Sequence, residues 1–306
     1  MNELFFLVNF FFFFNFTSSK KKMVFCRILY LVYAFLRSLE CMLIFFSYLC
    51  NKHRTHAKKL REKGHFIFKL VTEKVFLVKT YTTPTSEFLS VNNNRNGEKE
   101  KLNVILMNHI STVDFIILLD YLYDQNITNF HFVLKKEIKY IPGIGQLMAF
   151  GENIIVERNW QYDQKTITRE LDKIPNGGVL ILFPEGTRMS CQKLEQAQKY
   201  CFQNNLPIMD NMLVPKFHGA WSILNYLKAQ YRLGNVYDFT VHADNFQDRD
   251  KKDMFLPDIL MSGIGPVGFH IRKLDPKEIK TDYEEFKMWL LEKWQEKDKI
   301  MTSNFF

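Results

Sequence analysis

The stretch LNVILMNHISTVDFIILLDYLYDQ, residues 102–125, carries the strongest fold signal in the chain. Its first part, LNVILMNH, is a short apolar run bounded by polar residues and predicts a buried strand. Its second part, STVDFIILLDYLYDQ, predicts a helix with Ser111 or Thr112 as the N-cap. Between the two lie His109 and Asp114, an ionisable pair five positions apart in an otherwise apolar segment.

Strand and helix signals alternate along the rest of the chain. The runs FHFVLKKE, GENIIVERN and VLILFPEG predict further strands, and KTITRELDKI predicts a helix that stops before the PNGG turn at 175–178. Near the end, DYEEFKMWLLEKWQEKDKI predicts a helix whose apolar residues share one face and pack on the domain. Strands alternating with helices predict an α/β domain with a mixed, mostly parallel sheet flanked by helices.

The net charge is confined to the beginning of the chain. Residues 1–64 contain 11 Lys/Arg and 3 Asp/Glu, whereas residues 65–306 contain 30 of each, so the whole formal charge of +8 lies in the first fifth. A nucleic-acid enzyme usually carries its basic surface on the folded domain, so we expect no nucleic-acid partner. A neutral domain behind a basic, apolar segment predicts contact with membrane lipid.

The chain divides into three predicted regions. Residues 1–22 are a low-complexity, Phe-rich leader, interpreted either as a membrane-inserting segment or as translated non-coding sequence before a start at Met23. Residues 23–64 are predicted to form hydrophobic anchoring helices followed by the basic segment NKHRTHAKKLREK. The uncharged runs at 28–36 and 41–50 have 9 and 10 residues, whereas a bilayer-spanning helix needs about 20. We therefore favour two short helices in one leaflet over a single crossing helix. Residues 65–306 form the predicted main domain.

The cysteines and histidines do not show metal-ligand spacing. The five cysteines lack a CxxC pair, and the eight histidines lack a companion pattern such as H-E-x-x-H. We expect reduced thiols, a cytosol-facing domain and no metal site.

The pair in the opening stretch has a catalytic interpretation. With His109 at the end of a strand and Asp114 in the first turn of a helix, the carboxylate can return to one imidazole nitrogen and leave the other to accept a proton. A serine triad is not supported, because the G-x-S-x-G elbow is missing and Ser111 is better explained as a cap. For the pair alone, a purely structural histidine remains an open alternative.

Three further blocks contain candidate ligands. In LFPEGTR, residues 182–188, Gly186 permits close backbone approach and Arg188 offers a planar fork suited to phosphate. The run KKEIKYIPGIGQLMAFGENIIVERN, residues 135–159, ends near Arg158. The block LVPKFHGA places Pro215 and Lys216 after another apolar run. Taken singly, such arginines are more often surface ion pairs than ligands.

In this order and spacing, the blocks closely resemble the four motifs of the glycerolipid acyltransferases, a family that includes 1-acylglycerol-3-phosphate acyltransferases. The motif H-x4-D alone is weak, but NHISTVD followed some 70 residues later by FPEGTR is specific. The likeness covers roughly residues 23–302 and looks most like the epsilon-type members. It implies the glycerolipid acyltransferase fold and makes residues 65–306 an acyltransferase domain.

The resemblance also implies an activity. It is the membrane-bound transfer of an acyl chain from acyl-CoA, a co-substrate, to the sn-2 hydroxyl of lysophosphatidic acid, without a cofactor. In this assignment His109 is the general base and Asp114 orients it, while Pro215 and Lys216 serve the acyl-CoA side. The residues that the resemblance assigns to the acceptor phosphate are Glu185, Gly186, Thr187, Arg188 and Arg158.

Two alternatives remain beside this assignment. The same residues would serve another lysophospholipid acceptor, such as lysocardiolipin, because the motifs do not specify the headgroup. A non-catalytic membrane scaffold would show decayed motifs, whereas His109, Asp114, Glu185 and Arg188 are all intact here. The resemblance leads us to expect a location at the endoplasmic reticulum membrane, with the mitochondrial outer membrane as the alternative. It leaves the oligomeric state open.

Overall fold

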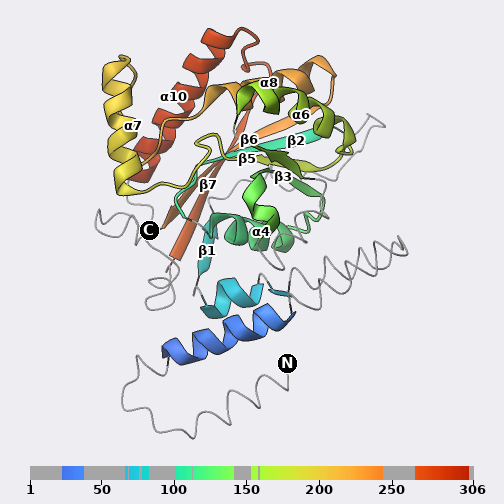
Figure 1. Ribbon diagram of the computed structural model, residues 1–306, viewed down its shortest axis with the longest axis vertical. Coiled ribbons are helices and arrows are strands. Elements are labelled where there is room, and N and C mark those ends of the chain that lie inside the picture. Colours follow the sequence, from blue (N-terminus) through green and yellow to red (C-terminus); the bar gives the residue numbers. More distant parts are fainter. Residues whose placement is uncertain are drawn as a thin grey trace, which may run out of the picture.

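A seven-stranded sheet forms the centre of the protein (Figure 1). The computed structural model describes residues 23–37, 66–75, 78–82, 101–140, 153–243 and 266–302, with residues 68, 112 and 158 excepted. The strand order is β1-β7-β6-β2-β5-β3-β4. The strands are β1 (Lys79–Thr82), β2 (Leu102–Met107), β3 (Phe130–Lys135), β4 (Ile154–Val156), β5 (Val179–Leu182), β6 (Leu233–Ala243) and β7 (Pro266–Leu274).

The sheet is mixed and mostly parallel, as predicted. Neighbouring strands in the series β6, β2, β5, β3 and β4 pair in parallel, as do β1 and β7. Among the described strands, β6 and β7 alone pair antiparallel. All six residues of β2 are buried. A parallel strand covered on both faces is a nearly continuous apolar run, which is why LNVILM, with Asn103 as its one polar residue, is recognisable in the sequence.

Helices cover both faces of the sheet. In Figure 1, α6, α8 and α10 lie on one face, while α4 lies on the other face beside η1. The helices are η1 (Val71–Val75), α4 (Asp114–Asp124), η3 (Lys136–Tyr140), α6 (Trp160–Lys173), α7 (Cys191–Gln203), α8 (Phe217–Ala229) and α10 (Tyr283–Thr302). The predicted apolar face of α10 is confirmed, because Phe286, Trp289, Leu290 and Trp294 are buried.

The predicted cap of α4 is wrong for Ser111. The helix begins at Asp114, and its N-cap position is Val113, which makes no side-chain capping bond. The Ser111 hydroxyl instead accepts a hydrogen bond from the Val113 N–H at 3.3 Å, inside the turn that precedes the helix. The other cap candidate, Thr112, lies outside the described residues.

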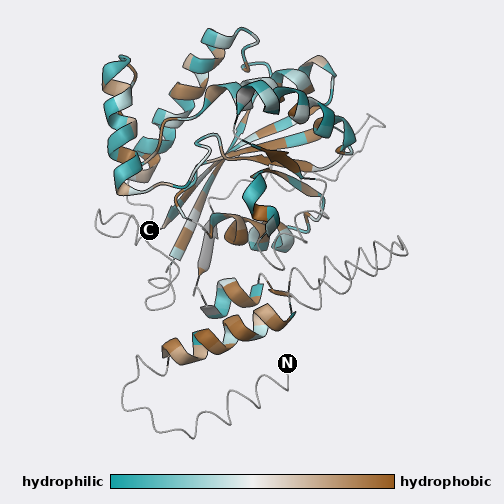
Figure 2. Ribbon diagram, in the orientation of Figure 1, coloured by the Kyte–Doolittle hydropathy of each residue, from teal (hydrophilic) through white to brown (hydrophobic). Residues whose placement is uncertain are grey.

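One helix of the predicted anchor is described. Residues 23–37 are helical, and Figure 2 shows the segment as predominantly hydrophobic. Its outward side chains include Ile28, Val32, Phe35 and Leu36, which are 43–53% exposed. Among the described helices, none combines the length and the apolar character needed to cross a membrane. The predicted leader 1–22 and the rest of the anchor, 38–64, lie outside the described residues.

Candidate active site

His109 and Asp114 meet at the carboxyl end of β2. The His109 Nδ1 lies 2.9 Å from Asp114 Oδ2, and the Asp114 side chain is 1% exposed. The same carboxylate oxygen accepts the Ser111 N–H at 2.9 Å, which fixes its position. Because an ionised carboxylate only accepts hydrogen bonds, this contact favours the tautomer with the proton on Nδ1 and the lone pair on Nε2. The predicted pairing of the two side chains is therefore present.

The FPEGTR loop lies beside this pair because β2 and β5 are neighbours. Leu106 of β2 and Leu182 of β5 are in register, and His109 and Glu185 each follow three residues later. The Phe183 ring packs 4.7 Å from the imidazole, centroid to centroid, and covers part of the ring. Parallel strands thus bring two blocks, some 70 residues apart in sequence, to one edge of the sheet.

Glu185 is placed differently from its predicted role. Its side chain is buried, and its Oε1 accepts the His109 backbone N–H at 3.2 Å. Burial raises the pKa of Glu185 to about 8, while the His109 N–H and the charge of Lys297 oppose that rise. Glu185 therefore supports the loop that carries His109. The predicted contact of Glu185 with the acceptor phosphate stays a prediction.

Gly186 gives the loop its shape. Its φ is +68°, and a Cβ built there would lie 3.1 Å from Lys216 Cδ and 3.6 Å from Lys216 Nζ. Only glycine adopts this conformation without strain. The Lys216 N–H also donates to the Pro184 carbonyl at 2.7 Å, and Pro215 is buried. The fourth predicted block therefore packs against the third.

The loop has a cationic contact that the sequence analysis missed. Lys193 Nζ lies 2.7 Å from Thr187 Oγ1 and 3.1 Å from the Arg188 carbonyl oxygen. Ser190 caps α7 by accepting the Lys193 N–H at 3.3 Å, which turns the helix so that Lys193 reaches back. The signal in the sequence was a serine followed three residues later by lysine, directly after the loop.

Not every predicted residue is placed. Arg158 lies outside the described residues, so its proximity to the phosphate site stays a prediction. The described residues contain no group of three or more His, Cys, Asp or Glu side chains arranged to hold a metal ion. Among the described residues, no disulfide links Cys26, Cys191 and Cys201.

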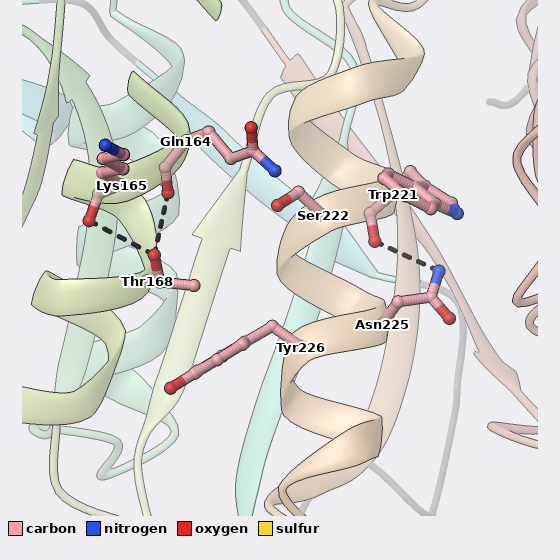
Figure 3. A pocket seen from close by; sticks show the side chains of 7 residues that line it. All are labelled: Gln164, Lys165, Thr168, Trp221, Ser222, Asn225 and Tyr226. Carbon is pink, nitrogen blue, oxygen red and sulfur yellow. Dashed lines mark hydrogen bonds between the residues drawn. The ribbon is translucent and has the colours of Figure 1, made fainter. Parts of the chain in front are cut away.

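The groove in Figure 3 is separate from the catalytic pair. It lies between α6 and α8, is open to solvent, and is lined by seven residues from these two helices. None of the predicted site residues lines it. The chemistry described above is therefore at the edge of the sheet, and the groove has no assigned part in it.

Comparisons with known proteins agree with this arrangement. The sequence model of the Acyltransferase family matches residues 89–211, which include the His109–Asp114 pair and the FPEGTR loop. Lysophosphatidylinositol acyltransferase 10 of Caenorhabditis elegans is 28% identical over 65% of this chain and 51% of that protein. Probable 1-acyl-sn-glycerol-3-phosphate acyltransferase 5 of Arabidopsis thaliana is 30% identical over 65% of this chain and 52% of that protein.

Two further comparisons concern a mouse protein and a solved structure. 1-acyl-sn-glycerol-3-phosphate acyltransferase epsilon of Mus musculus is 28% identical over 66% of this chain and 58% of that protein. The chain thus spans little more than half the length of these curated relatives. The crystal structure of the 1-acyl-sn-glycerophosphate acyltransferase PlsC from Thermotoga maritima has the same fold, with a TM-score of 0.50 and 15% identity. That match covers 92% of this chain and 99% of PlsC. These matches support the resemblance to the glycerolipid acyltransferase family that the four motifs indicate.

Proposed function

We propose that this protein transfers a fatty acyl chain from acyl-CoA to the sn-2 hydroxyl of lysophosphatidic acid and so forms phosphatidic acid. The observation that carries the proposal is the 2.9 Å contact between His109 Nδ1 and the buried Asp114 carboxylate, with the Gly186 loop beside it. The pair supplies a base, and the loop supplies a place for the acceptor phosphate.

The reaction needs one base and no covalent enzyme intermediate. His109 Nε2 accepts the proton of the acceptor hydroxyl as the hydroxyl oxygen attacks the thioester carbonyl carbon. The tetrahedral intermediate then expels the CoA thiolate, which takes the proton back from the imidazolium. During these steps Asp114, 2.9 Å from Nδ1, orients the ring and stabilises its positive charge.

The acceptor phosphate fits the cationic side of the loop. Lys193 reaches Thr187, so its ammonium group lies beside the loop that also carries Arg188. A phosphate monoester carries roughly −1.5 to −2 charges at pH 7, more than the single charge of a phosphodiester. This charge favours lysophosphatidic acid, the acceptor class for which the Arabidopsis and mouse relatives are named.

Another lysophospholipid is the second candidate acceptor. The C. elegans relative is named for lysophosphatidylinositol, and the catalytic pair acts on the hydroxyl without contacting the headgroup. The acylation chemistry is the same for both acceptors. The choice between them depends on the cations around the loop, which makes it an experimental question about the headgroup.

The donor and the membrane contact complete the proposal. Lys216 occupies the N-cap position of α8, directly after the buried Pro215, and its charge suits the phosphates of CoA. The outward face of residues 23–37 suits a lipid surface, because its exposed apolar side chains would leave water on binding lipid. We place the protein at the endoplasmic reticulum membrane, with its catalytic domain facing the cytosol.

The test is acyl transfer by the purified full chain in liposomes. Release of CoA thiol and the lipid product are measured with acyl-CoA and a panel of lysophospholipids that differ in headgroup. We expect the highest kcat/KM with lysophosphatidic acid and an Arg188→Ala variant with a raised KM for this acceptor. A protein that acylates no lysophospholipid is not an enzyme of this class. A preference for lysophosphatidylinositol or lysocardiolipin would select the second candidate.

A further inference from the structure

A fully buried ammonium group contacts the end of β2 that leads into His109. Lys297 of α10 is 0% exposed, and its Nζ donates hydrogen bonds to the carbonyl oxygens of Leu106 at 3.0 Å and Phe239 at 2.6 Å. Leu106 lies near the end of β2 and Phe239 lies in β6, so this one ammonium ties the two strands together. His109 follows Leu106 by only three residues.

The contact with α10 continues beyond the end of β2. The Asn108 side chain donates to the Val241 carbonyl at 3.0 Å and accepts the Val241 N–H at 2.8 Å, which extends the pairing of β2 with β6. Met301, one turn after Lys297 on α10, contacts the Asn108 amide at 3.5 Å. The last turns of α10 therefore support the residues that lead directly into His109.

Lys297 belongs to a buried charge cluster. Its Nζ lies 2.6 Å from Asp238 Oδ1 in a close ion pair, and Asp238 also accepts hydrogen bonds from Arg272, which in turn binds Glu296. Glu296 also pairs with Lys293 at 3.2 Å, so three cations and two anions are linked in this cluster. Burial lowers the pKa of Lys297, and Asp238 opposes that shift. A buried lysine is costly to maintain unless it is paired, and this one is paired at the back of the active site.

The same charge acts on the carboxyl that holds the His109 main chain. The positive charge of Lys297 favours the ionised form of Glu185, while the negative charge of Asp114 disfavours it. The Trp294 ring lies beside the ammonium, with its centroid 4.7 Å from Lys297 Nζ. Its indole also favours the ionised form of Glu185, although the indole N–H makes no hydrogen bond of normal geometry. Glu185 accepts the His109 N–H, so Lys297 reaches His109 by a second route.

We propose that Lys297 is a positioning residue of the active site, whose ammonium fixes the end of β2 that leads into His109. This role goes beyond the four sequence motifs, because it lies on the C-terminal helix, about 190 residues after the catalytic pair. The expected effect of Lys297 on kcat rests on the proposed acyl transfer. Its expected effect on the titration of Glu185 is independent of that proposal.

The electrostatic arm is an infrared titration of the full chain. The C=O band of the protonated Glu185 carboxyl, assigned by its loss in Glu185→Gln, is followed against pH. The wild-type midpoint is expected near pH 8. Lys297→Met removes a charge that favours ionisation, so the midpoint moves to higher pH. The matched control is Lys299→Met, an exposed lysine two residues further along α10, which leaves the midpoint unchanged.

The kinetic arm separates positioning from substrate binding. We expect Lys297→Met to lower kcat by on the order of 10- to 100-fold, because a displaced general base loses alignment. KM for both substrates remains near wild type, since Lys297 touches neither of them. The charge-conserving Lys297→Arg restores part of kcat, and Lys299→Met keeps all of it. A folded Lys297→Met protein with the wild-type midpoint and wild-type kcat would overturn the proposal.

The proposal stays testable where Lys297→Met does not fold or where the wild-type protein shows no acyl transfer. Where Lys297→Met does not fold, the double variant Lys297→Met/Asp238→Asn removes both buried charges, and the same measurements on it decide. Failure of both variants to fold would reduce Lys297 to a residue of stability alone and overturn its positioning role. A wild-type protein without acyl transfer would refute the proposed function, while the infrared arm would still test the effect of Lys297 on Glu185.

Discussion

Replacing Asp114 by asparagine removes one charge from the catalytic pair and preserves its shape. The carboxylate is 1% exposed, lies 2.9 Å from His109 Nδ1, and accepts the Ser111 N–H at 2.9 Å. Asparagine keeps an oxygen that can accept one of these N–H groups. The fold is therefore expected to survive, whereas the stabilisation of the imidazolium is lost.

The magnitude follows from the burial of the pair. Breaking a buried ion pair costs about 3–5 kcal/mol. His109 becomes positively charged only as it takes the proton of the acceptor, so this cost falls on the transition state. At about 1.4 kcal/mol per tenfold change in rate, kcat falls by on the order of 10²–10⁴-fold. KM remains close to wild type, because Asp114 touches neither substrate.

The assay is steady-state release of CoA thiol, with thermal unfolding of each variant as the check on the fold. The matched control is Asp120→Asn, a second buried aspartate of α4, whose carboxylate accepts the Thr72 hydroxyl at 2.8 Å. We expect this control to retain wild-type kcat. If Asp114→Asn folds normally and loses less than about threefold in kcat, Asp114 does not support the base and the assigned mechanism fails.

Three further predictions concern the loop after β5. The pKa of Glu185 is raised in the folded protein, so its contribution to stability is fully present below the usual pKa of a glutamate and is lost as pH rises through about 8. The free energy of unfolding, measured with urea, therefore falls by a few kcal/mol between pH 5 and pH 9. We expect Glu185→Gln to flatten this pH dependence. An equally steep slope in the variant would show that Glu185 is not its cause. We expect Lys193→Met to raise KM for lysophosphatidic acid by about tenfold, the effect of losing one charge-assisted contact. The control Lys199→Met changes an exposed lysine of the same helix and leaves this KM unchanged. Equal KM values in both variants would exclude Lys193 from the phosphate site. Gly186→Ala destabilises the protein by about 1–2 kcal/mol because of its positive φ, whereas Gly219→Ala, with open space around the new Cβ in α8, stabilises it by up to about 1 kcal/mol; thermal unfolding that ranks them in the opposite order would refute the loop geometry.

The parts of the fold that the sequence predicts are those whose burial is apolar. Strands β2 and β5 are short runs of aliphatic residues, and the interior face of α10 repeats at helical spacing. Strand β6 received no prediction, because its buried residues include Asp238 and His242. A charged residue in a strand usually indicates exposure. Here it is buried because Arg272 and Lys297 come from distant elements to pair with it.

In the site, the sequence predicts which residues come close together but not the direction in which each side chain points. The distance of five residues between His109 and Asp114 is enough to predict their contact, because one turn joins a strand to a helix there. The direction of Glu185 is not predictable in this way. It depends on how the positive φ of Gly186 turns the loop and on the backbone N–H that His109 offers. Lys193 was missed because its contact with Thr187 exists only once α7 has formed.

The most direct test of the account compares wild type with His109→Ala in liposomes that contain lysophosphatidic acid and a labelled acyl-CoA. The account predicts that the wild-type protein forms labelled phosphatidic acid, and that the folded variant loses activity by at least the factor of roughly 10²–10⁴ contributed by a general base. Transfer by His109→Ala at a rate near wild type would contradict the central claim that His109 takes the proton of the lipid hydroxyl.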